Sequence, residues 1–324
     1  MAGRIMRGAL VVAIALGLAA PAVAADKVKL AVAQKGFWDS FGIYVADVNG
    51  YFKANNLDVE YSWTQGGAET VQAAATGTVD AAIGTGFLGV VGAYAKDVPV
   101  RVIATHMTGV PDVFWYVRAD NPIKSMQDFA GKRIAYSRPG STSQVILLAI
   151  APKLNPAPTL ISTGGVPSTR TQLMSGQIDA AWSVPPFGLD LVRKGDARIV
   201  FRGAEVKDLA TQTIRVSVAS ADALKNKRDV MRRIVKSYDD ALRWMYGKPA
   251  ESAALYAKFA EIDVVDARET IKFYSYQAHH VAKVNNLDLV MQQAIESKFI
   301  DKPLSKAQLD ELIDLVYIPP QTSP

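Results

Sequence analysis

The chain contains no cysteine and only three histidines among its 324 residues. Without cysteine it can form no disulfide framework, no thiolate nucleophile, no cysteine-ligated zinc site and no iron–sulfur cluster. A lipid linked to cysteine is excluded as well. His106, His279 and His280 leave few candidates for imidazole chemistry. The sequence therefore predicts neither a metal ion nor another cofactor.

Neither sign of charge dominates, with 36 Lys and Arg against 31 Asp and Glu and a formal net charge of +5. The densest basic stretch, Lys225–Lys236, also contains Asp229 and carries a helical pattern. A solvated helix face explains such a stretch more simply than a nucleic-acid patch does. With 49% hydrophobic and 21% charged residues, the composition is that of an ordinary globular protein. We expect no nucleic-acid partner.

The longest apolar run lies at the N-terminus. Arg4 and Arg7 precede the apolar stretch Gly8–Ala20, Pro21 breaks it, and Ala22–Ala24 supplies a small-x-small pattern. These are the three parts of a secretory signal peptide, and the run is short of the ~20 residues that a membrane span needs. We therefore expect residues 1–24 to be a cleaved signal peptide and the mature protein to be exported.

The body of the chain alternates between strand and helix patterns, and it does so twice. The first copy predicts strands at 28–33, 57–63 and 79–83, and the second predicts strands at 131–136, 160–162 and 178–182. Helices are predicted between them, at 43–52, 68–76, 141–151 and 168–175. The phrases Thr76–Ala82 and Ser175–Ala181 match, each closing a helix at a glycine before a strand of small residues. Two similar α/β lobes with mainly parallel sheets follow from this alternation.

The C-terminal third is mostly helical. After a strand at 214–219, helical patterns occupy 230–245, 250–260, 267–284 and 306–316, the last beginning after Ser305, a typical N-cap. We expect the chain to cross into the second lobe near Val117 and to return near Thr213. Lobe 1 would then comprise 25–117 plus 214–324, and lobe 2 would comprise 118–213. The proline-rich tail from Pro319 is expected to be unpacked.

Loops at the carboxyl ends of strands are the best candidates for a binding site, because ligands of open α/β sheets bind there, near helix N-termini. In lobe 2, Ser137 ends such a strand, and Gly140, Ser141 and Thr142 open the next helix. A glycine that allows close backbone approach, hydroxyls and the free N–H groups of a helix start can form an anion cradle. One of the two hydroxyls is also expected to cap the helix, so anion binding would be an added role.

The corresponding loop of lobe 1 carries Lys35, Phe37, Trp38 and Asp39. Phe37 and Trp38 either form a wall of the cleft or pack beneath the loop.

Further candidates follow other strands of the two lobes. Each has a structural alternative: a plain turn for the glycine, strand-end packing for the strand residues, and a structural role for the histidine. These candidates are Gly66, Thr85, Gly86, His106, Trp182 and Ser183.

The motifs of common enzyme classes are missing. The chain has no Gly-x-Ser-x-Gly elbow, no phosphate-binding loop, no Gly-x-Gly-x-x-Gly after a strand and no His-Glu-x-x-His. His279 and His280 are adjacent on a predicted helix, so they point about 100° apart and cannot hold one metal together. Acid, base or nucleophile roles are left to His106, Asp39 and Lys35. An exported α/β enzyme stays open as an alternative.

Several short motifs, in a fixed order behind the expected signal peptide, resemble those of a known family. They are Ile43–Ala46 through Gly50–Phe52 and Leu57–Val59, Gly77–Ala82 with Gly84, Ile123–Ala135, and the glycine–hydroxyl helix start Gly140–Ser143. The family is that of the periplasmic solute-binding proteins of ABC importers, in the nitrate/sulfonate/taurine group. The resemblance covers almost the whole mature chain.

The resemblance implies an α/β, two-lobed periplasmic-binding-protein fold of type II, in which each lobe is a mostly parallel sheet flanked by helices. The ligand cleft lies between the lobes, which close by hinge motion. The function implied is capture of a small anion, such as a sulfonate, a carboxylate or a nitrate-like ion. A periplasmic monomer, not lipid-anchored, would deliver this anion to a permease in the inner membrane. Residues Lys35–Asp39, Thr85, Gly86, Gly140–Thr142 and Trp182 would line the cleft.

One departure from the family pattern concerns the segment after the second Asp-Ala strand. Relatives commonly carry Trp-Glu-Pro there, whereas this chain has Trp182 followed by Ser183, Val184 and Pro185. That acid often serves the amine of a substrate, so the departure favours a plain anion over a zwitterion. Fungal enzymes that make the thiamine pyrimidine share the fold but depend on a cysteine-rich segment. The absence of cysteine therefore disfavours an enzyme of this fold acting on a small heterocycle.

Overall fold

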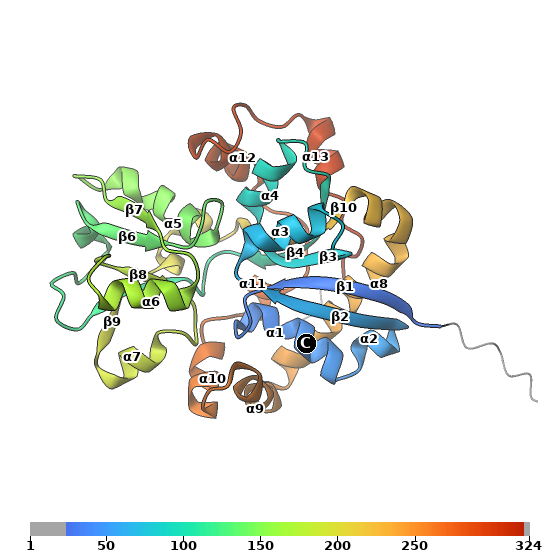
Figure 1. Cartoon of the computed structure of the whole chain (residues 1–324), viewed down its shortest axis with the longest axis horizontal. Helices are drawn as coiled ribbons and strands as arrows, with labels where there is room; N and C mark the ends of the chain where they lie inside the picture. Colours follow the sequence, from blue (N-terminus) through green and yellow to red (C-terminus); the bar gives the residue numbers. More distant parts are fainter. Residues whose placement is uncertain (1–23, 321–324) are drawn as a thin grey trace, which may run out of the picture.

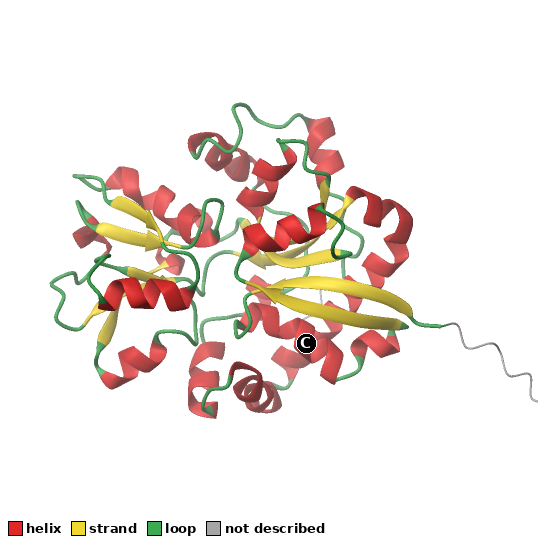
Figure 2. Ribbon diagram, in the orientation of Figure 1, coloured by secondary structure: helices red, strands yellow, loops and turns green. Residues whose placement is uncertain are grey.

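The computed structural model describes residues 24–320, and the ribbon falls into two parts, each with strands flanked by helices (Figures 1 and 2). The expected signal peptide and the last four residues lie outside the described range, apart from Ala24. Within that range no helix has both the length and the apolar character needed to cross a membrane. The α/β, two-lobed class predicted from the sequence is confirmed.

The first lobe is built on a five-stranded sheet with the order β2-β1-β3-β10-β4. Its strands are β1 (Asp26–Ala33), β2 (Leu57–Thr64), β3 (Ala81–Gly86), β4 (Val100–Thr108) and β10 (Thr213–Ser220). β1 pairs in parallel with β2 and β3, whereas β10 is antiparallel to both of its neighbours. The expectation of mainly parallel pairing thus holds for the strands joined by helical crossovers and is wrong for β10. This strand returns from the second lobe without such a crossover.

Helices cover both faces of this sheet (Figure 1). The first four are α1 (Trp38–Val48), α2 (Tyr51–Ala54), α3 (Gly67–Ala75) and α4 (Phe87–Tyr94), and the long helix α8 (Ala221–Gly247) follows β10. In α8 the buried residues Ile234, Tyr238 and Leu242 recur every four positions, as predicted for an amphipathic helix. The remaining helices are α9 (Pro249–Ala260), α10 (Val264–Ile271), α11 (Tyr276–His279), α12 (Leu287–Glu296) and α13 (Lys306–Leu312).

Two predicted helices are shorter than their sequence pattern, and β4 explains both. The helix expected over 267–284 is interrupted after Ile271, and the backbone of Ala282 instead exchanges two hydrogen bonds with Thr105 Oγ1. The helix expected to reach 316 ends at Leu312, because Asp314 and Val316 donate backbone hydrogen bonds to β4. In the second case the acceptors are backbone carbonyls of β4, an edge strand whose unpaired groups are open to passing chain segments.

The second lobe has a three-stranded sheet, β8-β5-β9, and a two-stranded sheet, β6-β7. The strands are β5 (Phe114–Arg118), β6 (Arg133–Tyr136), β7 (Thr159–Ser162), β8 (Ala181–Ser183) and β9 (Ala197–Arg202). Its helices are α5 (Thr142–Ile150), α6 (Val166–Met174) and α7 (Leu189–Lys194). β6 and β7 are parallel, while β5 is antiparallel to β8 and β9. The chain changes sheet between Thr108 and Phe114, earlier than the predicted crossing near Val117, and it returns between Arg202 and Thr213.

The repeated phrase noticed in the sequence has the same geometry in both lobes. Gly77 and Gly176 take positive φ values of 70° and 74°. The aspartate three residues later accepts a hydrogen bond of 2.8 Å from a strand N–H, Lys29 to Asp80 and Arg133 to Asp179. In each copy the turn after a helix is thus fixed to a parallel strand of its own lobe, β1 in the first and β6 in the second.

Candidate ligand-binding site

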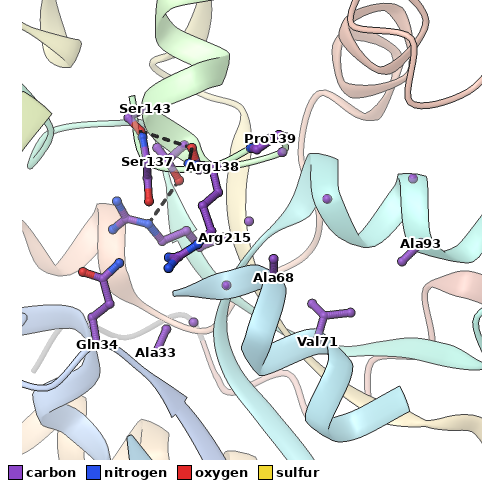
Figure 3. Close-up of a pocket in the computed structure, with 18 of the residues that line it drawn as sticks. Ala33, Gln34, Ala68, Val71, Ala93, Ser137, Arg138, Pro139, Ser143 and Arg215 are labelled. Atoms are coloured by element: carbon purple, nitrogen blue, oxygen red, sulfur yellow. Dashed lines mark hydrogen bonds between the residues drawn. The ribbon is translucent and has the colours of Figure 1, made fainter. Parts of the chain in front are cut away.

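A cavity of about 270 Å³ lies between the two lobes, and we call it the central cavity. Its lining comes from segments 33–39, 67–72 and 84–98 of the first lobe and 137–143 and 182–184 of the second, with Val113, Arg215 and Phe299. Figure 3 shows Ser137, Arg138 and Ser143 on one side, Ala33, Gln34 and Ala68 on the other, and Arg215 between them. The cavity therefore lies where strands of both lobes end and helices begin.

The sequence-predicted site residues divide into two groups. Those on the cavity wall are Phe37, Asp39, Gly86, Ser137, Gly140, Ser141, Thr142 and Trp182. Those that do not line it are Lys35, Trp38, Gly66, Thr85, His106 and Ser183.

Trp38 and Phe37 diverge although they are neighbours in sequence. Trp38 is fully buried beneath the first turn of α1, and its Nε1 donates to the hydroxyl of Tyr246 at 3.1 Å. Its ring lies edge-on to Tyr256, with centroids 5.0 Å apart. Phe37 instead lines the cavity and meets Phe187 of the second lobe at 5.6 Å. The expected wall role thus falls to Phe37, while Trp38 packs beneath the loop because helices α8 and α9 cover that side.

His106 belongs to a buried cluster behind the cavity wall. Its Nε2 lies 3.3 Å from the hydroxyl of Tyr238 and 3.8 Å from Asp39, and the same hydroxyl lies 2.9 Å from His279 Nε2. Burial lowers the pKa of His106 and that of His279 to about 3. Both imidazoles are therefore neutral in the folded protein near neutral pH, and they act as links between β4, α8 and α11.

These two histidines predict an acid-sensitive fold. An unfolded histidine has a pKa near 6.5, so between pH 6.5 and 3 the unfolded state binds more protons than the folded state. The free energy of unfolding should fall with decreasing pH in this window, by at most about 1.4 kcal/mol per pH unit for each histidine. Urea denaturation between pH 7 and 5 measures this slope. We expect His279→Asn to reduce this pH slope. Tyr246→Phe keeps both imidazoles and should retain the slope. Equal slopes for wild type and His279→Asn would show that His279 does not cause the acid sensitivity.

The other predicted residues outside the cavity have structural contacts. Lys35 is exposed and paired with Glu261 at 3.2 Å. Thr85 Oγ1 donates to the carbonyl of Val216 at 3.0 Å, and Ser183 Oγ donates to the carbonyl of Phe187 at 2.7 Å. Gly66 precedes α3 with φ 150°. In the fold, Thr85 and Ser183 thus have the strand-end packing, and Gly66 the turn, that the sequence offered as alternatives to ligand binding.

The N-terminus of α5 is shaped as the sequence predicted. Ser141 is the N-cap, and its Oγ accepts a hydrogen bond from the N–H of Gln144 at 3.3 Å. Gly140 has φ +78°, and a Cβ there would lie 2.8 Å from the Cα of Gly89 in α4. Glycine is therefore required at this position both for the turn and for the close approach of the two lobes.

Arg215 is the principal charged group of the cavity, and sequence reasoning missed it. From β10 its Nη1 reaches Asp39 Oδ2 at 3.0 Å and Asp112 Oδ2 at 2.7 Å, and its Nε donates to Thr142 Oγ1 at 3.3 Å. Burial alone would lower the pKa of Arg215, but Asp112 and Asp39 raise it. Burial also raises the pKa of Asp112. The signal available in the sequence was a single arginine within the otherwise uncharged strand 214–219.

Two buried side-chain atoms of cavity-lining residues lack a hydrogen-bond partner within residues 24–320, and one nitrogen of Arg215 makes no hydrogen bond there. Asp39 Oδ1 and Trp182 Nε1 are buried and unpaired. The bonds of Arg215 are made by Nε and Nη1, which leaves Nη2 without one. The side chain of Arg215 is 8% exposed. Arg215 therefore brings a positively charged, unpaired N–H donor to the cavity, which suits an anionic ligand.

Arg138 connects the two lobes at the edge of the same cavity. It extends from the loop before α5, and its Nη1 donates to the carbonyl of Gln65 in the first lobe at 2.7 Å. Figure 3 shows this side chain passing from the Ser137 side toward the Ala68 side. Arg138 was not among the residues predicted from the sequence.

The comparisons agree with this architecture. The family described as NMT1/THI5 like matches residues 38–252. The periplasmic aliphatic sulphonate-binding protein SsuA from Escherichia coli superimposes with a TM-score of 0.72 at 16% identity, over 92% of this chain and 95% of that one. The alkanesulfonate-binding protein SsuA from Xanthomonas axonopodis pv. citri, bound to MOPS, gives a TM-score of 0.70 at 15% identity, over 83% and 89%. None of the curated proteins compared with the chain matches it.

An enzyme shares the fold as well. The desulfurization enzyme DSZB gives a TM-score of 0.61 at 18% identity, over 90% of this chain and 96% of that one. The fold is thus that of the periplasmic binding proteins, and solved structures with it include binding proteins and an enzyme. Because the family match spans well over half of the chain, the protein belongs to the NMT1/THI5-like family.

Proposed function

We propose that this protein is an exported solute-binding protein of an ABC importer, which captures a small organic anion in the central cavity and delivers it to a permease in the inner membrane. The observation that carries the proposal is the unpaired Nη2 of the buried Arg215 beside the N-terminus of α5. A buried guanidinium and the free N–H groups of a helix start are both donors to anions. The sulfonate-binding proteins among the structural relatives support the same role.

The two lobes supply the closing motion in this proposal. The chain passes between the lobes at 109–113 and at 203–212, and these segments act as hinges. Arg138 on Gln65 and Phe187 on Phe37 are contacts between lobes that the closed form makes. The proposal also includes the cleaved signal peptide at 1–24 and a monomeric periplasmic protein without lipid on cysteine.

The experiment that tests the proposal is a thermal-shift screen of the purified mature protein against sulfonates, aromatic carboxylates, nitrate and pyrimidines. A ligand at ~100 times its dissociation constant should stabilise the fold by about 2.7 kcal/mol. We expect at least one organic anion to raise the melting temperature. A panel in which no anion shifts the melting temperature would contradict the proposal.

The cradle at the start of α5 gives a sharper test. We expect Ser141→Ala combined with Thr142→Ala to weaken anion binding at least ~10-fold in calorimetry, because one hydroxyl shapes the helix start and the other holds Arg215. Loss of the Ser141 cap should also cost about 1 kcal/mol of stability. Ser305→Ala is the matched control, since it removes the N-cap of α13 away from the cavity. Unchanged affinity in the double variant would remove the cradle from the site.

An enzyme of the same fold is the competing function. His106 is separated from the cavity, and the sequence contains no cysteine to act as a nucleophile. Mass spectrometry of a ligand incubated with the protein distinguishes the two functions. We expect full recovery of the unchanged ligand, whereas catalytic conversion would establish an enzyme.

A further inference from the structure

Two buried carboxylates share one guanidinium at the wall of the central cavity. Asp39 Oδ2 and Asp112 Oδ2 lie 3.0 and 2.7 Å from the same nitrogen of Arg215, Nη1. Asp112 is fully buried, and Asp39 is nearly so. With both acids ionised, the cluster carries two negative charges against one positive charge. It is therefore short of one positive charge before any ligand binds.

The other titratable side chains around the pair leave this balance unchanged. Burial lowers the pKa of two histidines to about 3 and raises the pKa of four tyrosines. All six are neutral near pH 7, so within residues 24–320 Arg215 is the only cation within ion-pairing distance of either acid. The six come from β4, α8, α9 and the segment 274–279, and they are His106, Tyr238, Tyr246, Tyr256, Tyr274 and His279.

An anion in the cavity adds a further negative charge to this cluster. The donor open to it is Nη2 of Arg215, while Asp112 holds Nη1 of the same guanidinium. The anion and the Asp112 carboxylate then lie on neighbouring nitrogens, in a buried region where solvent and salt screen charges little. A like charge at this range favours the protonated form of a carboxyl group.

Of the two acids, Asp112 is the better acceptor for that proton. Asp39 lies in the first turn of the 11-residue helix α1, where the helix dipole favours a negative side chain. Asp112 lies on the segment between β4 and β5, outside any helix, and burial already raises its pKa in the unliganded protein.

We propose, resting on the solute-binding function above, that Asp112 is a proton site coupled to the ligand site: binding of an anion at Arg215 Nη2 is accompanied by uptake of one proton from solvent at the Asp112 carboxylate. Arg215 stays charged, the Asp112 carboxylate becomes a neutral carboxyl group, and the total charge of the site is the same before and after binding. Asp112 does not line the cavity and acts through Arg215, so it is a positioning residue. Because coupling between two binding events is reciprocal, the anion binds more tightly as the pH falls.

Calorimetry of the mature protein with propane-1-sulfonate, benzoate and nitrate tests this coupling. All three probes stay ionised between pH 6 and 8, so they take up no proton themselves. Titrations in buffers of different ionisation enthalpy count the protons taken up, and we expect between about 0.3 and 1 per bound anion at pH 7. The affinity should rise from pH 8 to pH 6, by up to about 10-fold per pH unit.

Asp112→Asn carries a neutral side chain at every pH, so it should take up no proton and bind the anion equally well at pH 6 and 8. At pH 8 it should bind roughly 10-fold more tightly than wild type, because the repulsion is gone. Asp239→Asn is the matched control, since it removes another buried acid with an arginine partner, from α8 and away from the cavity. This variant should keep the proton count and the pH slope of wild type.

The outcomes separate the proton site from the proposed function. If an anion binds without proton uptake, or if Asp112→Asn still takes up a proton, the role of Asp112 is overturned and the solute-binding function stands. If none of the three probes binds, the anion site at Arg215 and its proton fail together. The proposed function fails as well only if no anion of the thermal-shift screen raises the melting temperature.

Infrared spectra of wild type decide the question if Asp112→Asn does not fold. With isotope-labelled aspartate, binding of the anion should convert one carboxylate band into the band of a protonated carboxyl group. Unchanged aspartate bands in the anion-bound protein would overturn the proposal.

Discussion

Replacing Arg215 with glutamine should destabilise the folded protein by about 3–5 kcal/mol at neutral pH, the cost of removing one partner of a buried ion pair. Arg215 Nη1 pairs with Asp39 Oδ2 at 3.0 Å and with Asp112 Oδ2 at 2.7 Å. Glutamine retains a hydrogen-bond donor but no charge, so two buried carboxylates would be left uncompensated. Urea denaturation of wild type and variant at pH 7 measures the difference.

The pH dependence of this loss has a definite sign. Burial already raises the pKa of Asp112, and removing the guanidinium should raise it further above its value in the unfolded chain. The folded variant then binds more protons than the unfolded one, so the loss should shrink as the pH falls from 7 toward 5. Besides burial, Arg215 helps to lower the pKa of His106 and of His279. Its removal should weaken the acid sensitivity that these histidines cause, which acts in the same direction.

Two further variants make the Arg215 prediction falsifiable. Asp112→Asn added to Arg215→Gln removes one of the unpaired charges and should recover part of the lost stability. Arg118→Gln breaks an exposed pair with Asp120 and should cost no more than about 1 kcal/mol. A loss of less than 1 kcal/mol for Arg215→Gln, or a loss that grows on acidification, would show that the cluster does not depend on this cation.

Trp38→Ala should cost about 3–5 kcal/mol of folding stability and leave the ligand affinity of the folded protein within ~3-fold of wild type. The ring is fully buried between α1 and the C-terminal helices, beside Phe41 and Tyr256, and it does not line the cavity. Trp182→Ala should act differently, with at least ~10-fold weaker ligand binding, because Trp182 lines the cavity. Denaturation and calorimetry on the same preparations separate the two effects.

Trp63→Ala is the control for Trp38→Ala, because it removes a side chain of the same type and size from a less buried position. Trp63 is half-buried on β2, in ring contact with Phe259 at 5.4 Å. Trp63→Ala should therefore cost less than half of what Trp38→Ala costs. If Trp38→Ala weakened ligand binding as much as Trp182→Ala does, Trp38 would act at the cavity after all.

The features predicted correctly depend on residues that are close together in the sequence. Ser141 caps α5 and Ser305 caps α13 through bonds to residues three positions later. Gly77 and Gly176 close their helices at equivalent points, so the duplication was visible as a repeated phrase. The strands at 28–33 and 57–63 were found because alternation of apolar residues is a local pattern.

The features predicted wrongly depend on neighbours that the sequence places far away. The apolar residues over 267–284 and 306–316 have helical spacing, but part of each segment is hydrogen-bonded to β4 instead of continuing the helix. Likewise, an aromatic residue at a helix start can face either the loop or the core. The helices that enclose Trp38 come some 200 residues later, as its bond to Tyr246 shows.

By itself the sequence determined the α/β class, the repeated lobes and the glycine–hydroxyl start of α5, because each rests on short-range periodicity, turns and caps. Only the tertiary structure decided the electrostatics of the central cavity. Arg215 is separated from Asp39 by 176 residues and from Asp112 by 103. Such pairs leave no local pattern, since burial and charge compensation arise only when distant strands and loops come together in the folded chain.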